Sequence, residues 1–508
     1  MFLRVVQKIL QLLSWHNFAP LFLLLSTAIL YRGFLFESLW LDELVTYWAV
    51  SGPFPQVIAR SGSFLGQSPI PYLIPWSVAG YLSEAEWVLR LPSLLFTAAS
   101  CLVLYRLGRK FMPKDCAAFA VLIFIVIDEV LISAMSFRPY SLALFCSLLS
   151  LWYLIQWTSS GALRHALLYC IFTVLAIYNH YLFAGIFTVH FAYVMTARRR
   201  IPAKLPLDFA FIVLLIIAAV TPGALQFLKF SESHGEMSFR PAPGAADLIH
   251  ALLPLYLILY FVTAFLLTFL WFGKVPCRAP GTENRPFITT SLVWYLSGPL
   301  MLFTYSIAFD SSLFLSRYYL WSIPGLALCG GLLLSTLADQ QARRVAVAVF
   351  AFMAFVRESG RIWKIENWRN VPAVIETVAQ ERDPLVLLYS GLMESKRVNL
   401  SGTLVESGFL TAPLFYYPLR AQLIPIPPDF ESAELRRFFA EKVRVAFESR
   451  NQFFLVCLDQ TLIDGQERIS ICQRHISTLA GENFKAKELS PGEHVRTIVF
   501  NRTANSNQ

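Results

Sequence analysis

Four short groups of polar residues combine side chains that could transfer a proton and hold an anion. Asp42 and Glu43 supply two adjacent carboxylates, Arg138 and Arg317 supply guanidinium groups, and His180 supplies an imidazole. A carboxylate within hydrogen-bond reach of a hydroxyl group can act as a general base. An arginine makes charge-assisted, often paired, hydrogen bonds to a phosphate group. Brought together by the fold, this set could deprotonate a hydroxyl group beside a bound phosphate.

Each of these residues also has an explanation that involves no chemistry. An arginine at the end of an apolar segment often extends its guanidinium group to the lipid headgroups. A single histidine between apolar helices is more often a packing residue than a ligand, and interfacial tyrosines form the usual aromatic belt. Two acids just beyond an apolar segment can simply be solvated, because charged groups avoid hydrocarbon. The elements around these residues must therefore decide between the two interpretations.

The composition is that of a membrane protein. Of the 508 residues, 56% are hydrophobic and 15% are charged, whereas about 25% of the residues of a soluble protein are charged. The net charge is +9, and many of the basic residues lie in short loops between apolar runs. That distribution indicates membrane orientation and not a nucleic-acid groove. We expect membrane lipids, and no nucleic acid, as partners.

The apolar runs predict a polytopic α-helical membrane protein with about eleven transmembrane helices. The expected spans are 18–36, 89–107, 116–134, 139–157, 165–178, 181–197, 208–226, 248–272, 287–308, 317–337 and 344–357. No small-residue cleavage site clearly follows the first run, so we expect that run to be retained as a helix. The run over 165–197 is long for one helix and short for two, and we divide it at Asn179-His180.

Basic residues predict the orientation of these spans. Lys and Arg precede the first span and follow the second, fourth, sixth, eighth and tenth. Loops rich in Lys and Arg face the cytoplasm. The intervening loops, which contain the candidate residues named above, then face outward, and an odd number of spans places the C-terminal tail outside as well.

The loop over 37–88 and the tail differ from the spans in composition. The loop is rich in aromatic residues and proline and poor in charge, which suits interfacial helices lying on lipid. The sequence changes character at Arg357, so we predict a transmembrane domain over 1–357, which includes this loop, and a soluble extracytoplasmic domain over 358–508. The soluble domain contains no GxGxxG and no P-loop sequence, and we assign it no nucleotide.

Apolar runs of strand length predict the fold of the tail. Strands are expected over 384–389, 421–426 and 453–458, and helices over 432–449 and 463–479. Alternation of strands and helices predicts a small α/β domain with a mainly parallel sheet. Cys457 and Cys472 lie in this domain. They are either two separate buried thiols or, with the tail outside, a disulfide.

The order of the polar motifs resembles that of the GT-C glycosyltransferases. The motifs are Asp42-Glu43 after the first span, Arg138-Pro139-Tyr140, His180-Tyr181, and Arg317-Tyr318-Tyr319 followed by Pro324. Within that superfamily the chain resembles the bacterial protein O-mannosyltransferase-like group, which includes the aminoarabinose transferases of lipid A. Glu366-Asn367-Trp368-Arg369 is similar to an Asp/Glu-x-Trp-Arg sequence that often opens the tail of such proteins. The resemblance covers residues 15–370.

The resemblance implies a GT-C-like fold and a function. The chain would take a sugar from a polyprenyl-phosphate donor and transfer it to a hydroxyl group of a lipid, glycan or protein. The reaction would occur at the outer face of the bacterial inner membrane and would invert the anomeric centre. Asp42 is the expected base and Glu43 its catalytic neighbour.

The resemblance and the chemistry of the side chains also suggest how the substrates bind. Arg138 and Arg317 are expected to bind the donor phosphate. The remaining substrate-binding candidates are Tyr140, His180, Tyr181 and Tyr318. No cofactor is required by this scheme. His180 would allow a divalent metal ion, but no second ligand is spaced to indicate one, so we predict no metal site.

One position departs from the pattern of the relatives. Many of them carry an acid two residues before the arginine of Arg-Pro-Tyr, and here that residue is Ser136. Asp128 and Glu129 lie about two and a half helical turns earlier, at membrane depth. They are either buried as neutral or paired groups or they take part in catalysis.

Two other functions remain open at this stage. A transporter or flippase of lipid-linked sugars would have paired repeats, or broken helices with charges near the middle of the membrane. We find no repeat, and apart from Asp128 and Glu129 the charges lie at the ends of spans. In a receptor or assembly protein that works through its tail, the outward carboxylates and arginines would be dispensable.

Overall fold

A computed structural model gives the architecture of the chain. It describes residues 32–63, 67–198, 205–234, 242–277, 284–309, 313–359, 366–390, 392, 408–426, 433–458, 468–491 and 494–503. Most of the first predicted span, 18–36, lies outside these residues, and only α3 (Arg32–Phe36) belongs to it.

The chain divides into two compact units. The helical unit consists of Met1–Leu35, Ile58–Ile74 and Trp87–Ile362. The tail unit consists of Phe36–Val57, Pro75–Glu86 and Trp363–Gln508. The tail unit thus includes two segments of the loop over 37–88, which the sequence alone did not indicate. The domain boundary that we placed at residue 357 stays a prediction.

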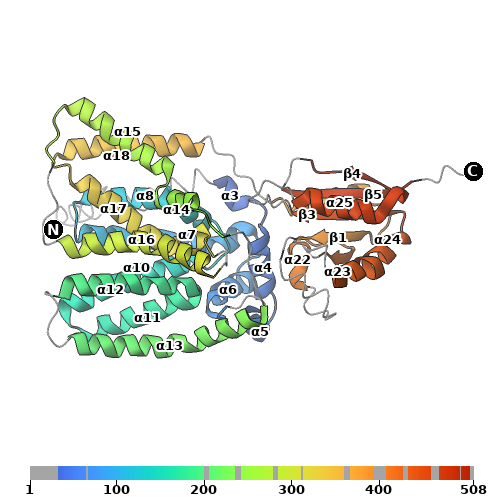
Figure 1. Ribbon diagram of the computed structural model, residues 1–508, viewed down its shortest axis with the longest axis horizontal. Coiled ribbons are helices and arrows are strands. Elements are labelled where there is room, and N and C mark those ends of the chain that lie inside the picture. The colour runs from blue at the N-terminus through green and yellow to red at the C-terminus, as the bar shows by residue number, and fades with distance from the viewer. Residues whose placement is uncertain are drawn as a thin grey trace, which may run out of the picture. The chain divides into compact units, whose positions relative to one another are not determined.

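Helices of different lengths, most of them apolar, build the helical unit (Figure 1). They are α7 (Glu86–Arg109), α8 (Lys114–Ile125), α9 (Asp128–Ala134), α10 (Tyr140–Ser160), α11 (Leu163–Asn179), α12 (Ile186–Ala197), α13 (Leu205–His234), α14 (Ala245–Leu252), α15 (Leu255–Phe272), α16 (Arg285–Ala308), α17 (Ile323–Ser335) and α18 (Gln340–Ser359). Short 3₁₀ turns join some of them: η1 (Ile70–Tyr72), η2 (Tyr181–Gly185), η5 (Ser316–Tyr318) and η6 (Leu320–Ser322).

Several described helices are suited to crossing a bilayer. Five are long and apolar enough to span it alone: Glu86–Arg109, Tyr140–Ser160, Leu207–Lys229, Leu255–Phe272 and Arg285–Ala308. Shorter apolar helices occupy Leu163–Asn179, Tyr181–Ala197 and Leu320–Ser335. The prediction of a polytopic helical membrane protein is confirmed, while the count of about eleven spans stays a prediction.

The prediction of one continuous helix over 116–134 is wrong. α8 and α9 are long enough to cross a bilayer only together, and the chain bends by 74° at the break between them. The break comes directly before Asp128, which opens α9. Acidic residues are favoured in the first turn of a helix, because the free N–H groups there carry partial positive charge. The division at Asn179-His180 is confirmed, since α11 ends at Asn179 and η2 begins at Tyr181.

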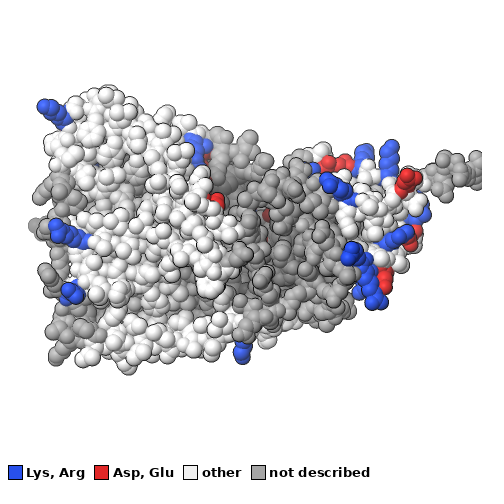
Figure 2. Space-filling model, viewed as in Figure 1, with Lys and Arg blue, Asp and Glu red and all other residues white. Residues whose placement is uncertain are grey.

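Close packing joins the helices of this unit. Neighbouring pairs include α10 with α11, α12 with α16, α16 with α17, α8 with α17, and α15 with α18. A Cβ atom at Gly325 would lie 2.4 Å from the backbone nitrogen of Tyr295, so α16 and α17 meet almost backbone to backbone. On the face drawn in Figure 2, the described surface over the helices is largely uncharged, as a lipid-facing surface requires.

The tail unit contains a five-stranded sheet. Its strands are β1 (Leu385–Tyr389), β2 (Gln422–Pro425), β3 (Gln452–Leu458), β4 (Phe484–Glu488) and β5 (Val495–Arg502), in the order β2-β1-β3-β5-β4. β1 runs parallel to β2 and β3. β5 runs antiparallel to β3 and β4. The three predicted strands and their parallel pairing are confirmed, and β4 and β5 form an antiparallel extension that was not predicted.

Helices complete the tail unit. They are α4 (Leu41–Val50), part of α5 (Phe54–Ser63), part of α6 (Leu73–Tyr81), α19 (Asn370–Val378), α22 (Ala412–Tyr416), α23 (Ala433–Phe438), the π-helical turn η7 (Phe439–Arg444), α24 (Val445–Glu448), α25 (Arg468–Ala480) and the turn η8 (Gly481–Asn483). The helix predicted over 432–449 is thus α23, η7 and α24 in succession. Charged side chains gather over this C-terminal part of the chain in Figure 2.

Aromatic rings fill the space beside the sheet. Phe453 stacks on Phe500 and Phe447, with centroid distances of 4.6 and 4.7 Å. Cys457 and Cys472 are both buried, free thiols with their sulfur atoms 3.0 Å apart. The structure therefore holds two buried thiols side by side, and a disulfide between them stays a prediction.

Candidate active site

Turns between helices present the predicted cationic residues of the helical unit. Arg138 precedes Pro139, the N-cap of α10. His180 has the extended backbone that ends α11. Arg317 lies in η5, a few residues before Pro324 in the first turn of α17. Proline lacks an N–H group and is tolerated in the first turn of a helix, so these prolines help to fix where each helix begins.

The turns bring five of the predicted residues together. The ring centroids of Tyr140 and His180 are 5.2 Å apart, and those of His180 and Tyr318 are 5.7 Å apart. The Arg138 guanidinium carbon lies 5.6 Å from the Tyr140 ring centroid, and that of Arg317 lies 5.4 Å from the Tyr318 ring centroid. We call these residues the arginine–aromatic cluster: three rings in a row with a guanidinium group at each end.

The cluster presents positive charge in an apolar setting. His180 is buried, and both Arg138 and Arg317 act on its imidazole electrostatically. Its Nδ1 atom finds no hydrogen-bond partner within the described part of the chain. A buried polar atom of this kind is normally satisfied by a partner. Positive charge and a buried nitrogen together suit an anionic ligand that accepts hydrogen bonds.

Tyr181 is the one predicted residue of the helical unit that faces elsewhere. Its ring packs on Phe227 of α13, with the centroids 5.6 Å apart. A Cβ atom at Gly223 would lie 3.1 Å from the Tyr181 ring, so the tyrosine fits closely against α13. Its role in substrate binding stays a prediction, and the packing gives it a structural role.

Asp42 and Glu43 lie in the first turn of α4, within the tail unit. Glu43 is fully buried, and its carboxylate accepts a hydrogen bond from the Trp40 N–H at 3.2 Å. An acid at the third helical position commonly reaches back to the N-cap in this way. Asp42 is only half-buried. Glu43 therefore caps the helix, and the Asp42 side chain keeps partial exposure.

Glu366 belongs beside these two acids and was missing from the predicted site. Its Oε2 atom accepts hydrogen bonds from the Leu41 N–H at 2.7 Å and from the Trp368 Nε1–H at 2.8 Å. Burial, with a smaller contribution from the Asp42 and Glu43 carboxylates, raises the pKa of Glu366 to about 7. The sequence had singled out the motif 366–369, and that was the only signal that could have found it.

Asp128 and Glu129 stand in a different environment. Arg357 of α18 forms a bidentate ion pair with Asp128, with Nη2–Oδ2 and Nη1–Oδ1 distances of 2.7 and 2.9 Å. The Arg357 guanidinium carbon also lies 4.1 Å from the Tyr256 ring centroid. Asp128 is thus a paired group, the first of the two interpretations open for it.

Ser136, which stands where many relatives carry an acid, is buried and donates a hydrogen bond to the Ile132 carbonyl.

Comparison with known proteins identifies the fold. Residues 67–222 match the dolichyl-phosphate-mannose-protein mannosyltransferase family. The structure is similar to the crystal structure of ArnT from Cupriavidus metallidurans bound to undecaprenyl phosphate, with a TM-score of 0.53 and 11% sequence identity. The likeness covers 94% of this chain and 97% of that chain. The chain therefore resembles the GT-C superfamily, through a family match over part of its sequence and through its fold. No curated protein sequence matches it.

The GT-C fold confirms the predicted fold class and the recognition from motif order. The matched stretch of the family contains Arg138, Tyr140 and His180, three members of the arginine–aromatic cluster. At 11% identity the likeness to ArnT extends to the fold alone, so the chemistry of this protein has to be argued from its own residues.

The described part of the structure offers no sign of a metal site. The described residues contain no group of three or more His, Cys, Asp or Glu side chains placed to hold a metal ion. The arginine–aromatic cluster offers one imidazole between two guanidinium groups, a setting that repels a cation. The expectation that no metal is required stays a prediction.

Proposed function

We propose that this chain is an integral-membrane glycosyltransferase that moves a hexosyl or pentosyl group from a polyprenyl-phosphate donor to an acceptor hydroxyl group. The acceptor is a lipid, a glycan or a protein. Transfer takes place at the extracytoplasmic face of the bacterial inner membrane, where the tail also lies. The observation that carries the proposal is the arginine–aromatic cluster, with its two guanidinium groups and three rings, in a chain with the GT-C fold.

The cluster supports recognition of a lipid phosphate. Arg138 and Arg317 provide charge-assisted hydrogen bonds to phosphate oxygens, and the rings between them provide an apolar surface for a sugar or an isoprenoid unit. The related fold of ArnT was crystallised with undecaprenyl phosphate, which favours a polyprenyl phosphate as the ligand here. Tyr140, His180 and Tyr318 are then substrate-binding residues.

The proposed reaction is a single displacement at the anomeric carbon. The acceptor oxygen attacks this carbon on the side opposite the phosphate, so a new C–O bond forms while the bond from the anomeric carbon to the phosphate oxygen breaks. The polyprenyl phosphate leaves with the bonding electrons, and Arg138 or Arg317 stabilises its developing charge. Asp42 accepts the proton of the acceptor hydroxyl group. The anomeric configuration is inverted, and no cofactor is consumed.

Binding of the lipid product tests the phosphate role directly. Purified protein should bind undecaprenyl phosphate in native mass spectrometry. Arg138→Ala and Arg317→Ala should each weaken binding on the order of tenfold, and the lysine variants should be intermediate, because lysine binds phosphate as a point charge. Arg106→Ala is the matched control, since Arg106 is an exposed arginine near the end of α7. Equal binding by all five variants would refute the phosphate role.

The acceptor can be identified in cells. Mass spectrometry of envelope lipids, glycans and proteins should show one glycosylated species that is present with the chain and absent without it. The same species should disappear when Asp42→Asn replaces the natural chain. If the species persists with Asp42→Asn, Asp42 is not the base. If the species is also present in cells without the chain, the chain is not its transferase.

A flippase of lipid-linked sugars is the alternative, and the break between α8 and α9 is the observation that favours it. Transporters use broken helices with charged residues at the break. Here, however, Arg357 neutralises Asp128. Proteoliposomes with a fluorescent lipid-linked sugar distinguish the two functions. A flippase would expose the lipid to an external reagent without any acceptor, and Asp42→Asn would leave that rate unchanged.

A further inference from the structure

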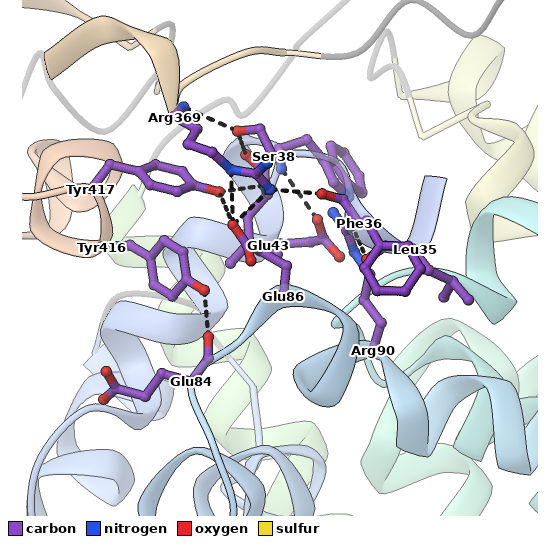
Figure 3. A network of polar contacts seen from close by, with 12 residues as sticks. Leu35, Phe36, Ser38, Glu43, Glu84, Glu86, Arg90, Arg369, Tyr416 and Tyr417 are labelled. Atoms are coloured by element: carbon purple, nitrogen blue, oxygen red, sulfur yellow. Dashed lines mark hydrogen bonds and ion pairs between the residues drawn. The ribbon is translucent and has the colours of Figure 1, made fainter. Parts of the chain in front are cut away.

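The motif at residues 366–369 holds the chain segment that leads into α4. The Arg369 Nη2 atom donates to the Phe36 carbonyl at 2.7 Å and pairs with Glu86 at 2.8 Å. The Arg369 N–H donates to the Ser38 hydroxyl at 3.3 Å. Figure 3 shows Arg369 reaching toward Ser38, Phe36 and Glu86. All of these residues belong to the tail unit.

A second set of contacts extends this hold. The Leu39 N–H donates to the Tyr417 hydroxyl at 2.8 Å, and that hydroxyl lies 3.2 Å from a Glu86 carboxylate oxygen. The Tyr47 hydroxyl donates to Glu84 at 2.6 Å, and the Tyr47 ring meets Tyr416 edge to face at 4.6 Å. Residues 36–41 are therefore tied at several points to residues more than 300 positions later.

Glu366 makes the contact nearest to the candidate base. Its Oε2 atom accepts the N–H of Leu41, the residue directly before Asp42. The Trp368 indole N–H donates to the same oxygen, so one carboxylate atom satisfies two buried donors. Among the residues that the structure describes, the other oxygen, Oε1, accepts no hydrogen bond. That oxygen is where a proton can be held.

We propose that Glu366 is a positioning residue for Asp42, because its carboxyl group fixes the first turn of α4 and sets the charge beside the base. This inference rests on the proposed function, in which Asp42 takes the proton of the acceptor. The Leu41 N–H is one of the first free N–H groups of α4, and such groups need a partner outside the helix. Glu366 supplies that partner from a distant part of the chain.

The charge of Glu366 is adjustable near neutral pH. Burial and then the Asp42 and Glu43 carboxylates raise its pKa to about 7, against the two hydrogen bonds that lower it. Asp42 and Glu43, both from α4, are the titratable groups that act on it. As pH rises through 7, Glu366 becomes an anion, and a second negative charge makes Asp42 a stronger base. Turnover should therefore rise in a step near pH 7.

The first test is the pH profile of transfer by the full-length protein in nanodiscs, with undecaprenyl-phosphate-linked sugars as donors. Glu366→Gln keeps an oxygen for the Leu41 and Trp368 donors and removes the charge, so it should be active without the step near pH 7. Glu366→Ala should lower kcat on the order of 10- to 100-fold, with a smaller change in KM, because α4 loses its anchor. The matched control is Glu376→Gln, an exposed glutamate on α19, which should keep both the step and the rate.

The second test needs no turnover. A carboxyl group with a raised pKa in the folded state binds more protons when folded than when unfolded between its ordinary pKa of 4.5 and about 7. Its contribution to stability is therefore complete below pH 4.5 and is lost as pH rises to about 7. The Tm of the wild-type protein should fall over this range more than the Tm of Glu366→Gln, while Glu376→Gln should follow the wild type.

The two tests separate failure of this inference from failure of the proposed function. A step that persists in Glu366→Gln, or normal kcat in Glu366→Ala, overturns the positioning role. Equal pH dependence of Tm in wild type and Glu366→Gln overturns it as well. A wild-type protein that transfers no sugar from any donor refutes the proposed function. In that case a flatter Tm profile in Glu366→Gln still supports the placement of Glu366 beside Asp42.

Discussion

Two Asp-Glu pairs open helices in this protein, and their surroundings differ. Asp42-Glu43 lies in the first turn of α4, and Asp128-Glu129 lies in the first turn of α9. The local reason for both is the same, since acids stabilise a helix N-terminus. The partners are opposite in charge. Asp128 pairs with the Arg357 guanidinium group, whereas the Asp42 turn meets the Glu366 carboxyl group.

The difference shows which surroundings suit an acid to a structural role and which suit it to proton transfer. A cation beside a carboxylate stabilises the charged form and leaves it little tendency to take a proton. A second acid beside a carboxylate raises the proton affinity of the pair, which is the property that a general base needs. Each deciding partner lies far along the chain, 229 residues away for Asp128 and 325 for Leu41. Local sequence therefore cannot distinguish the two pairs.

The largest expected effect separates the two aspartates by activity. Asp42→Asn keeps the size of the side chain and removes its charge, so turnover should fall on the order of 10²- to 10⁴-fold. Asp128→Asn should keep most of its turnover per folded molecule. The measurement is transfer of sugar from a polyprenyl-phosphate donor by purified variants whose folding is checked by thermal unfolding. Near-normal turnover by Asp42→Asn, with loss in Asp128→Asn, would reverse the comparison.

The next effect separates the two pairs by stability. Asp128→Asn removes the bidentate partner of Arg357 and leaves the guanidinium group paired with Glu358 alone, which should cost on the order of 1–3 kcal/mol. The double variant Asp128→Asn with Arg357→Met should lose less stability than the sum of the two single variants, because each single change already breaks this pair. Asp42→Asn should change stability much less. Thermal unfolding in nanodiscs gives these values, and additive losses in the double variant would argue against the ion pair.

Sequence reasoning succeeded where a local signal marks the position. Arg138 and Arg317 lie close before prolines that fit the first turns of α10 and α17, so their place at helix ends was predictable. The parallel strands were predictable because each is a short apolar run, such as the fully buried β1. β4 was missed because its exposed lysines hide the strand pattern. Glu366 was missed because its role depends on the hydrogen bond that it accepts from the Leu41 N–H. No local sequence pattern predicts which distant donor a carboxylate will contact.

A smaller effect is expected within the Asp42-Glu43 pair. Glu43→Gln should lower turnover less than Asp42→Asn, because Glu43 is buried and caps α4 through the Trp40 N–H. A glutamine can still accept that hydrogen bond, so the remaining loss reports the charge alone. Steady-state kinetics of both variants at equal stability decide the point. Equal losses would leave the base unassigned between the two neighbours.

The substitutions with the smallest expected effect test on which side of the membrane the Asp42 loop and the tail lie. Single cysteines at Arg60→Cys and Ala440→Cys should react with an impermeant maleimide in intact cells, since both are predicted to face outward. Native Cys277 is exposed and lies in a predicted cytoplasmic loop, so it should react only after lysis and serves as an internal control. Protection of both new cysteines in intact cells would overturn the orientation of Asp42 and of the tail.

The tie between Glu366 and Leu41 also affects how the protein matures. α4 leaves the ribosome long before its anchor, because the hydrogen-bonded residues are 325 positions apart. At about 5–20 residues per second, the interval is on the order of 15–65 s. Throughout that time the first turn of α4 lacks the acceptor for its Leu41 N–H and the neighbouring carboxyl group. Under the proposed function, a nascent chain therefore has its lipid-facing helices before its base is positioned, and we expect the late synthesis of residue 366 to delay the onset of activity.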